Sequence, residues 1–143
     1  MPRKSRRPSL PVSFARADLE AAGFSGWQPW AALRTSTYAE VPAAPATYVV
    51  YRASDGPPRF RKENPGGRFK GRDPTVTVET LRAKWVPGAH VIYISKADIG
   101  QRRLREFGRF GAGEPIAHWG GRYIWQLTDS AKLLVAWHEI AWQ

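Results

Sequence analysis

Hydrophobic residues in this chain gather in short runs separated by turns that contain Gly and Pro, a pattern typical of a small sheet. Runs rich in β-branched and aromatic residues predict strands at 47–52, 90–95, 122–127 and 132–140. A hairpin turn at 128–131 is expected to join the last two strands. The pattern therefore predicts a small mixed or antiparallel sheet of three to four strands.

Two short helices are predicted from the residues at their ends. The segment 15–22 is followed by Gly23, a residue type that commonly ends a helix. The segment 78–85 begins after Thr77, whose hydroxyl suits the N-cap position. The stretch 24–45 is rich in Trp, Ala and Pro, and we expect it to be irregular or helical.

The main helix is predicted at 99–107. Asp98 and Gln101 have the spacing of a capping box, in which the Asp side chain accepts from a free helix amide and the Gln side chain reaches back. Three glycines are expected to end this helix, namely Gly108, Gly111 and Gly113. The fold class that follows is α/β, or α+β, with the sheet flanked by helices.

The length of 143 residues suits one domain, which we expect at 13–143 after a basic, flexible arm at 1–12. A basic insertion loop is expected at about 56–75. No apolar run follows the first residues, so the sequence predicts neither a secretory signal nor a membrane span, and we expect a cytoplasmic protein. The chain has no Cys and three His, which excludes thiolate chemistry and argues against a histidine-rich metal site.

Net charge is the strongest feature of the composition, because 22 Lys and Arg against 12 Asp and Glu give +10 and a pI near 10.5. A polyanionic partner, DNA in the first place, is expected. The segment 59–72 interleaves its basic residues with Phe60 and Phe69, which suits contact with a phosphate backbone. A merely solvated surface is the alternative. The loop residues expected to bind nucleic acid are Arg61, Lys62, Arg68, Lys70 and Arg72.

A second basic cluster, on the predicted main helix, favours nucleic acid over a merely solvated surface. Helical spacing places Arg103 on one stripe with Ile99 and Phe107, beside Leu104. A guanidinium on a core-facing stripe has to be paired or used, because burying it alone is unfavourable. It is expected either to form a salt bridge or to receive a phosphate. Either contacts to the nucleic-acid backbone or a role as plain solvated charges is expected for the residues on the other faces, Arg102, Arg105 and Arg109.

The run Tyr93-Ile94-Ser95-Lys96-Ala97-Asp98, followed by Arg103 and Leu104, resembles the second half of the GIY-YIG nuclease signature. In the excision-repair incision enzymes of that family the strand, the Lys-Ala turn and the Arg-bearing helix likewise follow one another without a gap. Ala46-Thr47-Tyr48 stands where the GIY half is expected. The resemblance covers about 44–127, and the long spacing between the two tyrosines is similar to restriction-type members.

This resemblance implies hydrolysis of a DNA phosphodiester with one divalent metal ion, Mg²⁺ or Mn²⁺. It implies that Tyr48 and Tyr93 line the site, one of them helping to activate the attacking water, while Arg103 steadies the charge of the pentavalent phosphorus. Lys96 is expected to contact the nucleic acid. His118 is expected either to hydrogen-bond a phosphate or to fasten its own turn. An aromatic packing role is the alternative for each tyrosine.

The chain departs from the family pattern at four places. Ala46 and Ser95 replace the two glycines of the signature, and Phe107 stands where many members carry a Tyr or His. The family also places a metal-binding Glu on a later helix that the given residues lack. Glu139 is the acid nearest the end of the chain, and a solvated charge is the simpler interpretation of it.

Three hypotheses follow. The first is a DNA-binding GIY-YIG-type endonuclease domain that is incomplete or weakly active unless a tail or partner supplies the carboxylate. The second is a noncatalytic nucleic-acid-binding module derived from such a nuclease, and the third is a basic RNA-binding protein. Trp137 and Trp142 are expected to lack a covering helix, which would favour a homo-oligomer or a partner over the last strand.

Overall fold

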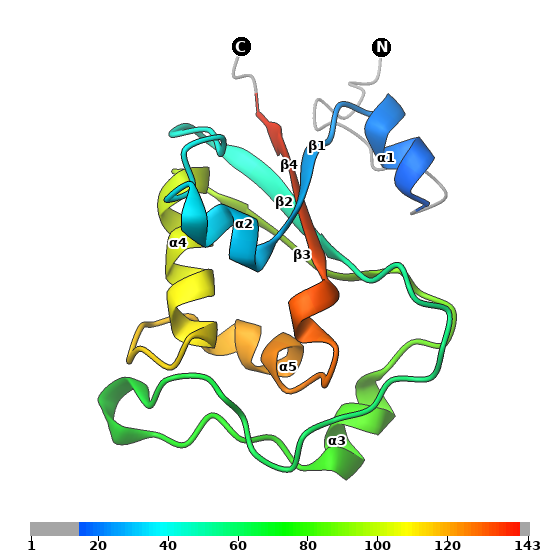
Figure 1. Cartoon of the computed structure of the whole chain (residues 1–143), viewed down its shortest axis with the longest axis vertical. Coiled ribbons are helices and arrows are strands. Elements are labelled where there is room, and N and C mark those ends of the chain that lie inside the picture. Colours follow the sequence, from blue (N-terminus) through cyan, green and yellow to red (C-terminus); the bar gives the residue numbers. More distant parts are fainter. Residues whose placement is uncertain (1–14, 141–143) are drawn as a thin grey trace, which may run out of the picture.

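The centre of the protein is an antiparallel four-stranded sheet in the order β1-β4-β2-β3 (Figure 1). The computed structural model describes residues 15–140, so the predicted arm at 1–12 and Trp142 lie outside the described part. The strands are β1 Ser25–Pro29, β2 Ala46–Tyr51, β3 Val91–Ala97 and β4 Leu134–Glu139. The helices are α1 Arg16–Ala21, α2 Trp30–Thr35, α3 Val78–Lys84, α4 Gly100–Gly111 and α5 Arg122–Trp125. Three short 3-10 turns add η1 Phe69–Gly71, η2 Trp119–Gly121 and η3 Ser130–Lys132.

Several predicted elements are confirmed. β2, β3 and β4 lie within two residues of the predicted strands, and α1, α3 and α4 form where helices were expected. Thr77 caps α3 as predicted, because its Oγ1 accepts a hydrogen bond of 3.2 Å from the amide of Thr80. The predicted mixed α and β class with a small antiparallel sheet is confirmed. No helix in residues 15–140 has the length and apolar character needed to cross a membrane.

The predicted strand at 122–127 is wrong, because residues 122–125 form α5. Ile124 and Trp125 are buried while Arg122 and Tyr123 are half-exposed, so burial does not alternate as in a strand. A short run of β-branched and aromatic residues is compatible with either element. The predicted hairpin turn at 128–131 is also absent, and the turn η3 leads into β4 instead.

The fourth strand comes from the stretch 24–45, which was expected to be irregular or helical. β1 pairs with β4, and the register shifts between Gly26 and Gln28. Gly26 and Trp27 adopt positive φ angles of 101° and 55°. This bulge breaks the alternation of apolar and polar positions, which is why the sequence pattern does not reveal the strand.

The capping box predicted for the main helix does not form. No side chain caps α4, and Gln101 donates from its Nε2 to the Tyr38 carbonyl at 2.9 Å. The first amides of the helix instead donate to the carbonyls of Pro42 and Ala44. These carbonyls satisfy the free helix amides, so a side-chain cap is unnecessary.

The glycines of α4 serve close packing rather than helix termination. The helix runs on through Gly108, where a Cβ atom would collide with the Tyr38 hydroxyl. Gly111 lies against the Trp125 ring in the same way. The chain leaves the helix only after these contacts, and Gly113, with φ of 99°, follows the last turn.

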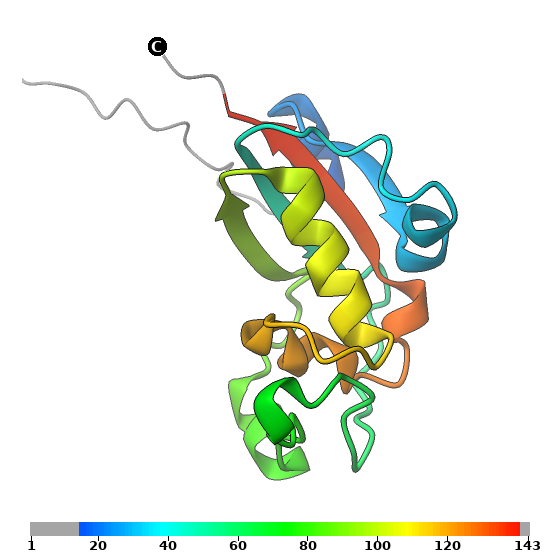
Figure 2. The same ribbon diagram turned by 90° about the vertical axis from the view of Figure 1, so that its left-hand side faces the viewer.

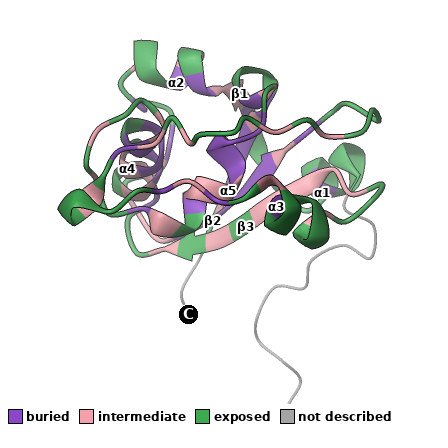
Figure 3. Cartoon of the chain, turned by 90° about the horizontal axis from the view of Figure 1, so that it is seen from below, coloured by how far each residue is buried: buried purple, intermediate pink, exposed green. Residues whose placement is uncertain are grey.

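Helix α4 lies diagonally across one face of the sheet (Figure 2). Its Leu104, Phe107 and Phe110 are fully buried there among aromatic side chains of α2, α5 and the sheet. On the opposite face a smaller cluster joins Leu19 of α1 to β-strand residues. The outer sides of α1 and α3 are exposed, while buried positions gather on the inner side of α4 and along the sheet (Figure 3).

Trp137 belongs to the larger core cluster and is 5% exposed. The expectation that it lacks a cover is therefore wrong. It packs on the α4 side of the sheet, and one face of its ring meets Gly26, where the missing side chain leaves room for it.

Candidate functional site

The two signature tyrosines lie on paired strands and on the same face of the sheet. Tyr48 stands opposite Ser95, and Val50 stands opposite Tyr93. Because alternate residues of a strand share a face, both hydroxyphenyl rings project toward α4. Their ring centroids are 6.2 Å apart with an interplanar angle of 26°. The pairing of β2 with β3 thus brings these two predicted site residues together.

Arg103 projects from α4 toward the same cluster. Its Nη1 donates to Glu106 Oε1 at 3.0 Å and to the Ala117 carbonyl at 2.9 Å. Its side chain remains 38% exposed, so it is not enclosed like Phe107 on the same stripe. The expected salt bridge therefore exists, yet the guanidinium keeps a surface open to solvent.

The Arg103 charge also acts on the tyrosines. Burial raises the pKa of Tyr48 well above its ordinary value and Tyr93 raises it further, while Arg103 partly offsets the rise. Burial likewise raises the pKa of Tyr93, again against the effect of Arg103. Both hydroxyls therefore stay protonated at neutral pH and act as hydrogen-bonding groups.

His118 completes the cluster from the turn that follows α4. Its side chain is fully buried and stacks on Phe107, with ring centroids 4.0 Å apart. Its Nε2 lies 3.4 Å from the Tyr48 hydroxyl. Burial, followed by the charge of Arg103, lowers its pKa to about 3, so the imidazole is neutral at pH 7.

This position favours the second of the two roles expected for His118, because a side chain with no exposed surface is better placed to fasten its turn to β2 and α4 than to meet a phosphate directly. It also places an imidazole directly against Phe107, the position at which the sequence lacks one. The sequence alone does not show that His118 brings an imidazole next to Phe107, because His118 lies in a turn eleven positions further along the chain.

The three predicted catalytic residues differ in access. Tyr48 is 1% exposed, whereas Tyr93 is half-exposed. Arg103 is also partly exposed and, unlike the two tyrosines, it lines a cleft of about 540 Å³ at the N-terminal end of α4. The cleft holds Lys96 and Arg102, both expected to bind nucleic acid, and the acids Asp98 and Glu106. An approaching phosphate therefore meets Arg103 before either tyrosine.

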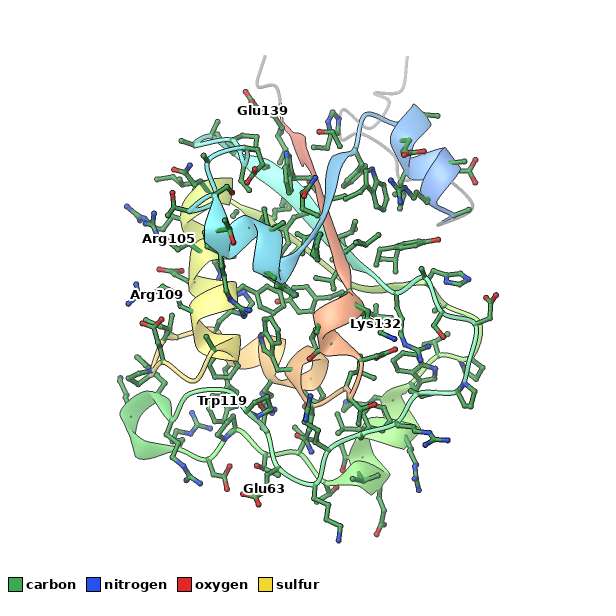
Figure 4. The ribbon with its side chains drawn as sticks, viewed as in Figure 1. Glu63, Arg105, Arg109, Trp119, Lys132 and Glu139 are labelled. Atoms are coloured by element: carbon green, nitrogen blue, oxygen red, sulfur yellow. The ribbon has the colours of Figure 1, made fainter. Side chains whose placement is uncertain are left out.

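The residues around this cleft do not fit a Mg²⁺ or Mn²⁺ site. Glu106 is engaged by the guanidinium of Arg103. Within residues 15–140, no three side chains of His, Asp or Glu gather as metal ligands. Glu139 is exposed at the end of β4, where Figure 4 shows it at the margin of the sheet.

In the family pattern a glycine at position 46 would allow another part of the backbone to lie close to β2. Here α4 supplies the glycine for this close packing, at Gly100. Ala46 is fully buried, and a Cβ atom added at Gly100 would lie 3.0 Å from its methyl group. The first turn of α4 therefore packs tightly on β2 despite the alanine. Ser95, at the second replaced glycine, is half-exposed beside Tyr48.

A buried amide side chain, that of Gln126, contributes to holding the basic loop at 56–75, together with backbone hydrogen bonds and Asn64. Gln126 is fully buried, and its Nε2 donates to the carbonyls of Arg61 at 2.8 Å and Val76 at 2.6 Å. Its Oε1 accepts from the Val76 amide at 2.9 Å and from Asn64 Nδ2 at 3.3 Å. The sequence prediction placed Gln126 in a strand and therefore missed this role.

The cations of the loop all remain exposed, namely Arg61, Lys62, Arg68, Lys70 and Arg72. Arg72 places its guanidinium 4.5 Å from the centroid of the Trp119 ring. Trp119 lies at the turn between α4 and α5, facing the loop (Figure 4). The loop charges thus reach the side of the protein on which the His118 turn lies.

Arg105 and Arg109 project outward from α4, away from the sheet (Figure 4). Arg109 is paired with Glu114 at 2.8 Å. The cations expected to bind nucleic acid therefore divide into the cleft, the loop and this outer side of the helix.

No protein-family model, no curated protein and no solved structure matches this chain.

Proposed function

We propose that this chain is a DNA-binding domain built on the plan of a GIY-YIG endonuclease. The observation that carries the proposal is the arrangement of Tyr48 and Tyr93 on paired strands under one helix, with Arg103 of that helix beside them. A net charge of +10 supports a polyanionic ligand. Cytoplasmic location, expected from the sequence, is part of the proposal.

The proposed roles of Arg103, Tyr93 and Tyr48 follow from how far each side chain is exposed to solvent. Arg103 receives a backbone phosphate, because it is a partly exposed cation at the edge of the cleft. Tyr93 hydrogen-bonds near that phosphate. Tyr48 is buried and acts through its neighbours, so it is a positioning residue.

Cleavage by residues 15–140 is expected to be slow or absent, because their carboxylates do not form a metal site. A noncatalytic binding module is the alternative within the same proposal. Self-association is not included, since Trp137 is buried in the core.

Two assays on the purified chain test the proposal. Duplex DNA binding is measured by fluorescence anisotropy at several salt concentrations, with structured RNA as a competitor at matched salt. Nicking of supercoiled plasmid is measured with Mg²⁺ or Mn²⁺, for the wild type and Arg103→Ala. We expect salt-sensitive DNA binding and little nicking, with any nicking lost in Arg103→Ala.

Failure to bind duplex DNA at low salt, or a preference for structured RNA, would overturn the DNA assignment. Rapid nicking that Arg103→Ala abolishes would show a complete catalytic centre instead of a weak one. Rapid nicking that Arg103→Ala leaves unchanged would remove Arg103 from the site.

A further inference from the structure

An aromatic groove of about 310 Å³ lies between α3, β3 and α5. Four rings from four separate parts of the chain line it, namely Phe60, Trp85, Tyr93 and Tyr123. Phe60 meets Trp85 edge to face at 6.1 Å between centroids. The buried Arg52 lies 5.3 Å from the Trp85 ring and is held by Asp129 at 2.9 Å. The groove wall is therefore fixed by packing and by an ion pair.

Tyr93 belongs both to this groove and to the tyrosine cluster beside Arg103. Gly120 also lines the groove, and a Cβ atom there would be 3.3 Å from the Tyr93 hydroxyl. Tyr93 is therefore the residue that connects the groove to the tyrosine cluster beside Arg103.

Two cations, Lys84 and Arg122, contact the Tyr123 ring of the groove. The Lys84 ammonium lies 5.7 Å from the centroid of Tyr123, and the Arg122 guanidinium lies 4.6 Å from the same ring. Arg122 also lies 4.9 Å from the ring of Trp119, which carries Arg72. No carboxylate stands among the described residues that line the groove. This combination suits a ligand with a flat π face and flanking negative charge.

We propose that the groove holds one unstacked nucleobase of a bound DNA strand. The base packs against the rings of Tyr123 and Trp85, each of which already carries a guanidinium on one side, while neighbouring phosphates meet Lys84 and Arg122. The volume suits a single small aromatic ligand and not a base pair with its stacked neighbours. This inference rests on the proposed DNA binding and adds that the domain prefers DNA with an unpaired base, because extruding a paired base requires extra free energy.

The test compares a duplex that carries one unpaired base with the same duplex fully paired, by fluorescence anisotropy at matched salt. Wild type is expected to bind the bulged duplex more tightly. Tyr123→Leu keeps an apolar side chain but removes the π face, so affinity for the bulged duplex should fall roughly 5- to 100-fold, as expected for the loss of one base stack. Affinity for the paired duplex should change little.

Tyr51→Leu is the matched control, because Tyr51 is also half-exposed but packs with the cluster on the opposite face of the sheet. It should leave the preference for the bulge intact. A second measurement uses wild-type protein alone. With 5-iodouracil at the bulge, irradiation is expected to crosslink the base to the peptide that contains Tyr123 or Trp85.

Equal binding of the two duplexes by wild type, or crosslinks only to other peptides, would overturn the groove as a base site while leaving DNA binding intact. Absence of binding to both duplexes would instead refute the proposed function itself. The two failures are therefore distinguishable.

Discussion

The hydroxyl of Tyr48 lies 3.4 Å from Nε2 of His118, and both residues are almost completely buried. The pKa of the imidazole is lowered to about 3 and that of the tyrosine is raised, so both partners are neutral at pH 7. Proton transfer between them is strongly unfavourable. The contact therefore connects the turn after α4 to β2 and holds the Tyr48 ring in place.

The buried His118 makes stability depend on pH. Between the unfolded pKa of 6.5 and the folded pKa of about 3, the unfolded chain binds one more proton than the folded chain. Stability is therefore full above pH 6.5 and is lost as the pH falls through this window. From pH 6.5 to 5 we expect His118 to account for a loss of about 2 kcal/mol in the free energy of unfolding.

Urea denaturation of wild type and His118→Leu at pH 6.5, 6 and 5 measures this contribution. All other titratable groups are shared by the two proteins, so the difference between the two pH slopes isolates the imidazole of His118. Parallel slopes would contradict a neutral, buried His118.

Gly108→Ala should destabilise the protein even though alanine favours a helix by about 1 kcal/mol. The added methyl group would collide with the Tyr38 hydroxyl inside the core. Overpacking of this kind costs about 1 to 3 kcal/mol. Thermal unfolding of the single and double variants checks the cause, since Tyr38→Phe removes the colliding oxygen and should recover part of the loss, with the ring carbon Cζ still 3.0 Å from the added atom. A double variant that is no more stable than Gly108→Ala would disprove this contact as the cause.

Gln126→Leu should release the basic loop. The substitution leaves the buried polar groups of Val76 without their partner, which costs about 3 kcal/mol in stability. Trypsin is expected to cleave faster after Arg61, Lys62 and Arg68. Gln28→Leu is the control, because within residues 15–140 the Gln28 side-chain amide donates only to the nearby Gly26 carbonyl, at 3.2 Å. Equal trypsin rates for wild type and Gln126→Leu would show that the loop is held by other contacts.

The sequence predicts the helices and strands whose own residue types and spacing match the burial and capping that they have in the structure. β2 and β3 have continuous β-branched and aromatic runs, and α3 carries a side-chain cap at Thr77. β1 escapes prediction because the bulge at Gly26 and Trp27 breaks its alternation. The α5 segment is misread because four residues are too few to show a helical period.

The candidate site also contains residues that were expected from the sequence and residues that only the structure shows. Tyr48, Tyr93 and Arg103 were expected together from the family resemblance, and the pairing of β2 with β3 under α4 brings the three near one another. His118 and Gln126 depend on how the chain folds back over α4 and the basic loop. Such contacts between distant segments leave no periodic trace in the sequence.

The proposed phosphate site depends most on Arg103, and Arg105 offers a matched control on the same helix. Arg105 is exposed and projects outward in Figure 4. Duplex DNA affinity of Arg103→Gln and Arg105→Gln at equal salt is the most direct measurement, with thermal unfolding confirming that both variants fold. We predict that Arg103→Gln weakens binding roughly tenfold and Arg105→Gln by less than about threefold. Equal losses for the two variants would contradict a phosphate site at the tyrosine cluster.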